Sequence, residues 1–122
     1  MKEQLISYKT AKLAKEKKFD LNCRYAQFVE DEEPIYNESA HNWNLYEEGY
    51  SVPTQSSLQK WLREKHELSV EVFSDETRWE VIVEKLPSYS AYDSEYSSDD
   101  KFNTYEEAFE EGLKQALKLI NI

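Results

Sequence analysis

The sequence predicts an α+β fold, in which an antiparallel sheet of about three to five strands packs against two or three helices. Two observations lead to this prediction. Three segments place apolar residues at helical spacing behind a capping residue, and several shorter segments alternate apolar and polar residues as strands do. At 122 residues the chain fits one domain over residues 1–122, since single domains commonly contain about 100–150 residues.

Each predicted helix begins at a residue that can cap it. Ser7 opens a helix over residues 7–18, and Thr104 opens the last helix of the chain. The helix between them begins either at Ser56, which forms a capping-box pattern, or at Thr54. Each pattern continues in an apolar stripe, so we expect each helix to bury one face.

Alternating residues predict the strands. Residues 68–73 and 79–84 alternate over their whole length and are expected to pair as an antiparallel hairpin. Residues 23–29 fit a further strand, and the alternation over residues 43–46 indicates a short one. Residues 89–100 are interpreted either as a third strand after the hairpin or as a loop.

The C-terminal half therefore has the order α-β-β-(β)-α, which is similar to that of a double-stranded-RNA-binding domain. That class needs a basic face at the start of its last helix. Here the last helix starts with Glu106 and Glu107, so the charges contradict RNA binding. Gly112 lies within the apolar stripe of this helix and allows a close approach to the sheet.

Charge is unevenly distributed along the chain, whose formal net charge is -10. Residues 1–24 carry seven basic and three acidic side chains, whereas residues 25–54 carry seven acidic and no basic ones. Residues of about 30–53, within this acidic part, form a loop-rich acidic segment. Farther along the chain, a Tyr/Ser/Asp-rich loop is expected at about 87–103. An acidic body repels phosphate, so we expect no nucleic-acid partner.

Composition also excludes several classes of site. Cys23 is the single cysteine, so a disulfide framework is excluded, and two glycines are too few for the usual phosphate-binding loops. Cys23, His41 and His66 are too few and too scattered for a typical zinc site. Residues 93–104 place oxygen ligands as a calcium loop does but lack its glycine and its final acid. We therefore expect no cofactor and no metal.

No segment is apolar over the length of a signal peptide or a membrane span. We therefore expect a cytoplasmic protein without a membrane partner. The sequence makes no prediction of the oligomeric state.

Aromatic residues in the acidic segment are the candidate partner-binding site. Tyr36, Trp43, Tyr46 and Tyr50 lie among polar and acidic neighbours, a composition that is typical of binding surfaces. The other interpretation is a cover, in which the same side chains close over one face of a sheet, because large aromatic residues are usually mostly buried.

Three further segments carry a resemblance to known proteins. They are residues 6–17 (ISYKTAKLAKEK), residues 53–66 (PTQSSLQKWLREKH) and residues 105–120 (YEEAFEEGLKQALKLI). On these segments the chain resembles a group of small uncharacterised proteins encoded by anaerobic gut bacteria and by their phages and prophages. The resemblance implies a phage or mobile-element origin, and it implies no activity, because that group has none assigned.

These observations lead to a non-enzymatic protein-interaction module as the first hypothesis for the function. The first alternative is an acidic DNA mimic or anti-defence inhibitor, which the basic residues 1–24 disfavour because a mimic needs an uninterrupted negative face. The second alternative is an enzyme with an unrecognised site, for which Cys23, His41 or His66 would have to line a pocket.

Overall fold

The computed structural model describes residues 3–74, 76–86, 94–98 and 101–121. These residues form three α-helices and two antiparallel three-stranded sheets, so the fold is α+β as predicted. The elements, in chain order, are α1 (Tyr8–Glu16), β1 (Cys23–Phe28), β2 (Ile35–His41), the 3-10 helix η1 (Trp43–Leu45), β3 (Gly49–Ser51), α2 (Gln55–His66), β4 (Leu68–Ser74), β5 (Trp79–Lys85), β6 (Ser94–Ser97) and α3 (Tyr105–Lys118).

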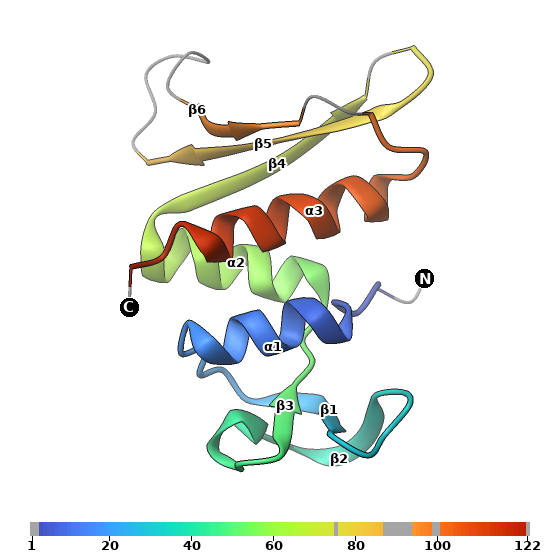
Figure 1. Ribbon diagram of the computed structural model, residues 1–122, viewed down its shortest axis with the longest axis vertical. Coiled ribbons are helices and arrows are strands. Elements are labelled where there is room, and N and C mark those ends of the chain that lie inside the picture. Colours follow the sequence, from blue (N-terminus) through green and yellow to red (C-terminus); the bar gives the residue numbers. More distant parts are fainter. Residues whose placement is uncertain (1–2, 75, 87–93, 99–100, 122) are drawn as a thin grey trace.

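The helices lie between the two sheets. Figure 1 shows the sheet β4-β5-β6 at one end, α2 and α3 beneath it, then α1, and the small sheet β2-β1-β3 at the other end. One buried apolar cluster runs through these layers and includes Ala14 of α1, Leu62 of α2, Leu113 of α3 and Val83 of β5. Burial of this cluster is the main term that holds the layers together.

All three helices run in the same direction (Figure 1). At one end Gln55, the first residue of α2, donates from Nε2 to the carbonyl oxygen of Glu106 in the first turn of α3, at 3.0 Å. At the other end Lys17, the C-cap of α1, donates from Nζ to the carbonyl oxygen of Ile120, at 2.7 Å. Parallel neighbours place like ends of their dipoles side by side, so charged side chains are needed at both ends.

Glu110 of α3 supplies the negative charge at the N-terminal ends of the other two helices. Its carboxylate accepts from the backbone N–H of Ser7, at 2.9 Å, and from the Thr10 hydroxyl. It also accepts from Nε2 of Gln55, at 3.0 Å. Thr10 and Gln55 are buried, so this carboxylate satisfies polar groups that water does not reach.

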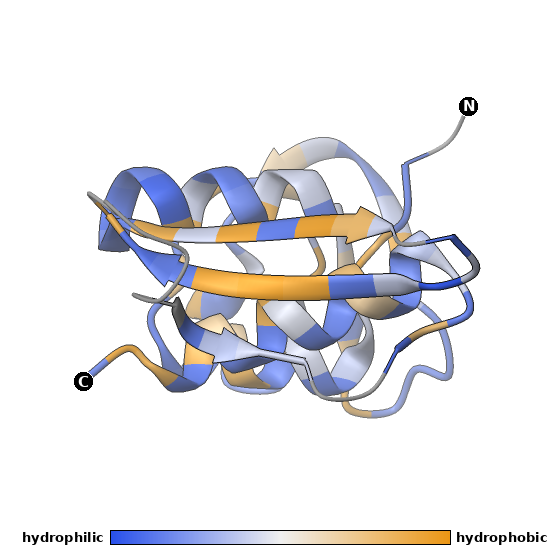
Figure 2. Ribbon diagram, turned by 90° about the horizontal axis from the view of Figure 1, so that it is seen from above, coloured by the Kyte–Doolittle hydropathy of each residue, from blue (hydrophilic) through white to orange (hydrophobic). Residues whose placement is uncertain are grey.

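The C-terminal half confirms the predicted order and adds the third strand. Every residue of β4 pairs with a residue of β5 in one unbroken register, and β6 pairs with the other edge of β5. Both α2 and α3 pack on this sheet, and the view from above in Figure 2 shows apolar and polar residues alternating along β4. The element order matches that of a double-stranded-RNA-binding domain, while Glu106 and Glu107 are exposed where such a domain needs basic residues.

Two local predictions are confirmed, one is decided between its two alternatives, and one is wrong. Ser7 and Thr104 are the N-caps of α1 and α3. The N-cap of α2 is Thr54, whose hydroxyl accepts from the N–H of Ser57, so Ser56 is not the cap. The short strand predicted over residues 43–46 is instead the helix η1, because Asn42 caps it by accepting from Asn44 N–H.

Candidate functional site

The register of the small sheet sorts its side chains onto two faces. Directly paired residues of an antiparallel ladder point to the same side. Tyr25 pairs with Tyr36, and Gln27 pairs with Tyr50, so these four lie on the inner face, which α1 covers. Residues of the other parity, Ala26, Phe28 and Ile35, lie on the outer face.

The helix η1 folds over this outer face. The ring centroid of Trp43 lies 6.2 Å from that of Phe28, and the Trp43 indole Nε1 donates to the carbonyl oxygen of Cys23 at 2.7 Å. The backbone N–H of Trp43 donates to the Ser51 hydroxyl at 2.9 Å. Gly49 keeps this cover close, since a Cβ there would lie 3.0 Å from the Trp43 carbonyl oxygen.

The cover presents apolar side chains to solvent. The ring of Tyr46 stacks on that of Trp43, with centroids 5.9 Å apart and planes at 29°. Tyr46 is 54% exposed, Leu45 81% and Ile35 49%. We call Ile35, Trp43, Leu45 and Tyr46 the outer patch.

The structure divides the four predicted site residues. It brings Trp43 and Tyr46 together in the outer patch. Tyr50 instead points inward, where its ring packs edge-on against Tyr8 at 5.4 Å. Tyr36 is 53% exposed but lies on the inner face, edge-on to Tyr25. Trp43 and Tyr50 thus pack on the two faces of the small sheet as the cover interpretation expects, and the binding-surface interpretation stays a prediction.

Two members of the outer patch were missed by the sequence reasoning. Ile35 and Leu45 are aliphatic residues in segments of strand-like pattern, and such residues are usually buried. The pairing of Ile35 with Ala26 and the helical turn at Leu45 expose them, and Asn42, the N-cap of that turn, is the local signal that could have found Leu45.

Lys15 fixes the loop that carries the patch. Its ammonium group donates to the carbonyl oxygens of Tyr46, Glu47 and Gly49, at 2.6, 3.1 and 2.8 Å. It also lies 4.7 Å from the centroid of the Tyr50 ring, which is a cation–π contact. All three ammonium hydrogens have acceptors. Lys15 therefore positions the loop, and its ammonium group is occupied by backbone carbonyl oxygens.

The possible nucleophile of the chain is chemically unsuited to that role. Cys23 pairs with His41 across β1 and β2, which brings two of the three catalytic candidates together. However, burial raises the pKa of the Cys23 thiol to about 11, although the Ser51 hydroxyl opposes this shift. The thiol donates to the Leu21 carbonyl oxygen, and the His41 ring packs edge-on against Trp43 at 5.1 Å. A protonated thiol is neither a nucleophile nor a metal ligand at neutral pH.

His66 lies elsewhere, at the C-terminal end of α2. Its ring packs edge-on against Trp61 at 4.7 Å, and its buried Nε2 has no hydrogen-bond partner in the described part of the chain. Burial lowers the pKa of His66 below its ordinary value, the Lys65 charge lowers it further, and Asp20 opposes both effects. The surroundings therefore favour the neutral imidazole over the charged one.

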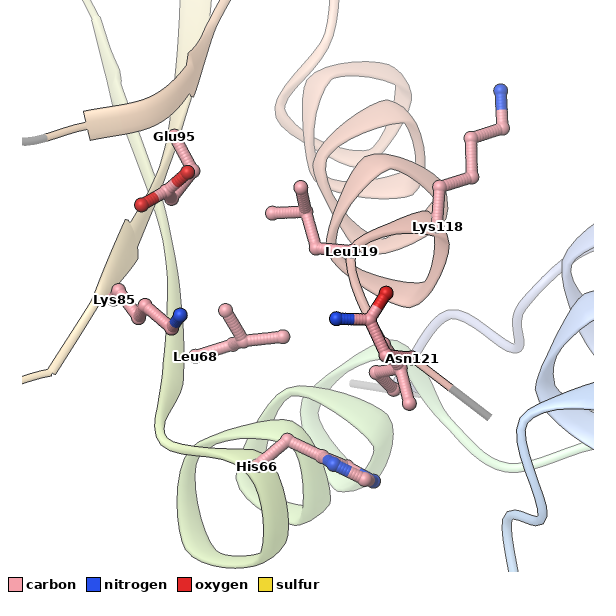
Figure 3. A pocket seen from close by; sticks show the side chains of 8 residues that line it. His66, Leu68, Lys85, Glu95, Lys118, Leu119 and Asn121 are labelled. Carbon is pink, nitrogen blue, oxygen red and sulfur yellow. The ribbon is translucent and has the colours of Figure 1, made fainter.

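A cavity of about 500 Å³ opens beside His66, between the sheet and the C-terminal end of α3. Figure 3 shows Leu68, Lys85 and Leu119 directed into this space, whereas the ammonium group of Lys118 points away from it. The described residues that line it include no cysteine, serine or threonine. They do include a histidine and a glutamate, and the His66 ring packs against Trp61.

Neither a metal site, nor a membrane span, nor a similar protein identifies the function of the described part of the chain. Among the described residues, no group of three or more His, Cys, Asp or Glu side chains is arranged to hold a metal ion, and the segment 93–104 lies partly outside the described residues. No helix in the described ranges has the length and apolar character that crossing a bilayer requires. No family model, curated protein or solved structure matches this chain.

Proposed function

We propose that this chain is a non-enzymatic protein-interaction module and that the outer patch is its docking surface. The observation that carries the proposal is the concentration of exposed apolar side chains on the small sheet. Of the nine large hydrophobic residues that are exposed in the described part of the chain, five lie between Val29 and Tyr46. Three of these five, Ile35, Leu45 and Tyr46, belong to the outer patch. Exposed apolar side chains that gather on one face are typical of protein–protein contact.

The outer patch also has the aromatic composition that is typical of interface hot spots. Trp43 is half-buried and held by two hydrogen bonds, so its indole is rigid before any partner arrives. Tyr46 stacks on it and remains half-exposed. Rigid aromatic residues lose little conformational entropy on binding and dominate interface energies. The phage or mobile-element origin is part of the same proposal, and the resemblance of residues 53–66 and 105–120 supports it.

The test is affinity capture from cells of the natural source with three forms of the protein. The double variant Leu45→Ser/Tyr46→Ser removes exposed apolar surface and leaves Trp43 in place. Phe73→Ser is the matched control, because Phe73 is an exposed aromatic residue on β4, in the other sheet. We expect the wild type and Phe73→Ser to retain one partner at stoichiometric yield and the double variant to lose it.

Retention of that partner by Leu45→Ser/Tyr46→Ser would contradict the assignment of the outer patch. Recovery of no partner at stoichiometric yield with the wild-type protein would contradict the interaction function itself. Far-UV circular dichroism on each variant separates loss of binding from loss of fold.

A further inference from the structure

Acidic residues adjoin the outer patch on the segments that lead into and out of it. Glu30 follows Val29 at the end of β1, and the backbone N–H of Val29 donates to the Glu48 carbonyl oxygen at 3.1 Å. This bond brings the chain beside Glu30 close to Glu48, and Glu47 precedes Glu48 in the chain. All three glutamates are exposed. Glu32 and Glu33 lie in the turn that leads into Ile35 and are exposed as well.

The nearby basic side chains do not neutralise this charge. Lys15 donates all its hydrogens to backbone carbonyls beneath the loop. Arg24 donates to the Tyr36 hydroxyl at 3.2 Å and to the Glu38 carbonyl oxygen at 2.9 Å, and neither acceptor is a carboxylate. The ion pairs found in the described residues lie elsewhere, on α2, on α3 and between Lys101 and Glu80.

From this arrangement, and resting on the proposed function, we infer that the partner is a protein surface with an apolar centre and a basic rim. Carboxylates that are unpaired in the free protein repel an acidic partner. A basic partner attracts them, because it places positive charges beside them. Charged rims steer association and reject wrong partners, whereas the apolar centre supplies most of the binding free energy. The surface therefore selects cationic partners by its rim and holds them by Leu45 and Tyr46.

Two synthetic amphipathic helices of about 14 residues, about four turns each, serve as probes. One is built from Leu and Arg and the other from Leu and Glu, so they share the apolar face and carry charges of opposite sign. Binding to the full chain is followed by amide chemical shifts in a ¹H–¹⁵N spectrum and by calorimetry. We expect the Leu/Arg helix to shift amides between Phe28 and Glu48 and the Leu/Glu helix to leave them unchanged.

Charge-reversal variants separate the effect of the glutamates beside the outer patch from the effect of the net charge of the protein. Glu30→Lys/Glu48→Lys reverses two rim charges, and Glu71→Lys/Glu76→Lys reverses two exposed charges at the other end of the molecule (Figure 1). The first pair should weaken binding of the Leu/Arg helix about tenfold or more, and the second pair less than about twofold. The affinity of the wild type should fall as ionic strength rises from about 50 to about 500 mM, since the Debye length shrinks.

The outcomes distinguish this inference from the proposed function. If Leu45→Ser/Tyr46→Ser abolishes binding while both charge-reversal pairs bind equally well, the outer patch is a docking surface and the charge selection is overturned. If the Leu/Arg helix shifts amides in the first turn of α3 rather than those of the small sheet, it follows bulk acidity, and the inference is again overturned. If the Leu45→Ser/Tyr46→Ser variant binds both helices as the wild type does, the outer patch itself is refuted.

Discussion

Replacing Gly112 with alanine tests the close approach of α3 to the large sheet. Alanine favours an isolated helix over glycine by about 1 kcal/mol, so at an exposed position Gly112→Ala stabilises. Gly112 is instead buried where α3 crosses the large sheet. A Cβ at this position would lie 2.4 Å from Cγ2 of Val81 and 2.8 Å from Cγ1 of Val70, whereas ordinary contacts begin near 3.4 Å. The helix and the sheet must separate by about 1 Å to admit the methyl group.

This separation outweighs the gain in helix propensity. Both valines are fully buried and branched at Cβ, so neither side chain can rotate away freely. Overpacking of a dense core costs about 1–3 kcal/mol, and a gap of about 1 Å along the rest of the interface forfeits a large part of its dispersion energy. With about 3 kcal/mol lost and about 1 kcal/mol gained, we expect Gly112→Ala to destabilise the fold by about 2 kcal/mol.

Urea unfolding followed by tryptophan fluorescence and far-UV circular dichroism measures this change. The midpoint should fall with little change in slope, and Tm should drop by about 6–12 °C for a chain of this size. Val81→Ala in the Gly112→Ala background makes room for the new methyl group, so the double variant should lose about 1–2 kcal/mol less than the sum of the single variants. A stabilisation near 1 kcal/mol for Gly112→Ala alone would refute the close approach of α3 to the sheet.

Three further predictions follow from buried polar groups. Glu110→Ala removes one acceptor from each of the buried residues Thr10 and Gln55, while Gln55 keeps its bond to the Glu106 carbonyl oxygen, so urea unfolding should show a loss of about 2–4 kcal/mol. Glu110→Gln keeps one acceptor oxygen and should lose less. Because burial raises the pKa of Cys23 to about 11, iodoacetamide should alkylate the native protein at least about 100-fold more slowly than the urea-unfolded chain; equal rates would contradict the buried thiol. Because the folded state lowers the pKa of His66, the unfolded chain binds a proton first, and stability should fall as pH drops below about 6.5 toward the lower folded pKa. His66→Gln should show a smaller difference in unfolding free energy between about pH 7.5 and about pH 5.5, and an unchanged difference would contradict the shift.

The parts of the fold that the sequence predicts correctly are those decided by neighbouring residues. Ser7 and Thr104 cap helices through bonds to residues three positions later, and the β4–β5 hairpin follows from its alternation. Such signals lie within a few residues of one another, so they can be interpreted before any tertiary contact is known.

The small sheet resisted prediction because distant residues decide it. The side chain of Asn44 donates to the Phe19 carbonyl oxygen and accepts from the Ser51 N–H, and the N–H of Trp43 finds Ser51 as well. These bonds turn a strand-like alternation into η1. The same bonds decide which aromatic residues of the candidate site are exposed, so Trp43 and Tyr46 could be named from the sequence but not separated from Tyr50.

The charge pattern of the sequence also acquires a physical cause. Two of the basic residues near the N-terminus have a structural role, since Lys15 and Lys17 donate to carbonyl oxygens of the loop after η1 and of Ile120. Three parallel helices accumulate negative dipole charge at their C-terminal ends, and basic residues there offset it. The acidic residues around the outer patch have no such internal role. Their charge is directed at solvent, and a cationic partner is the group that would stabilise it.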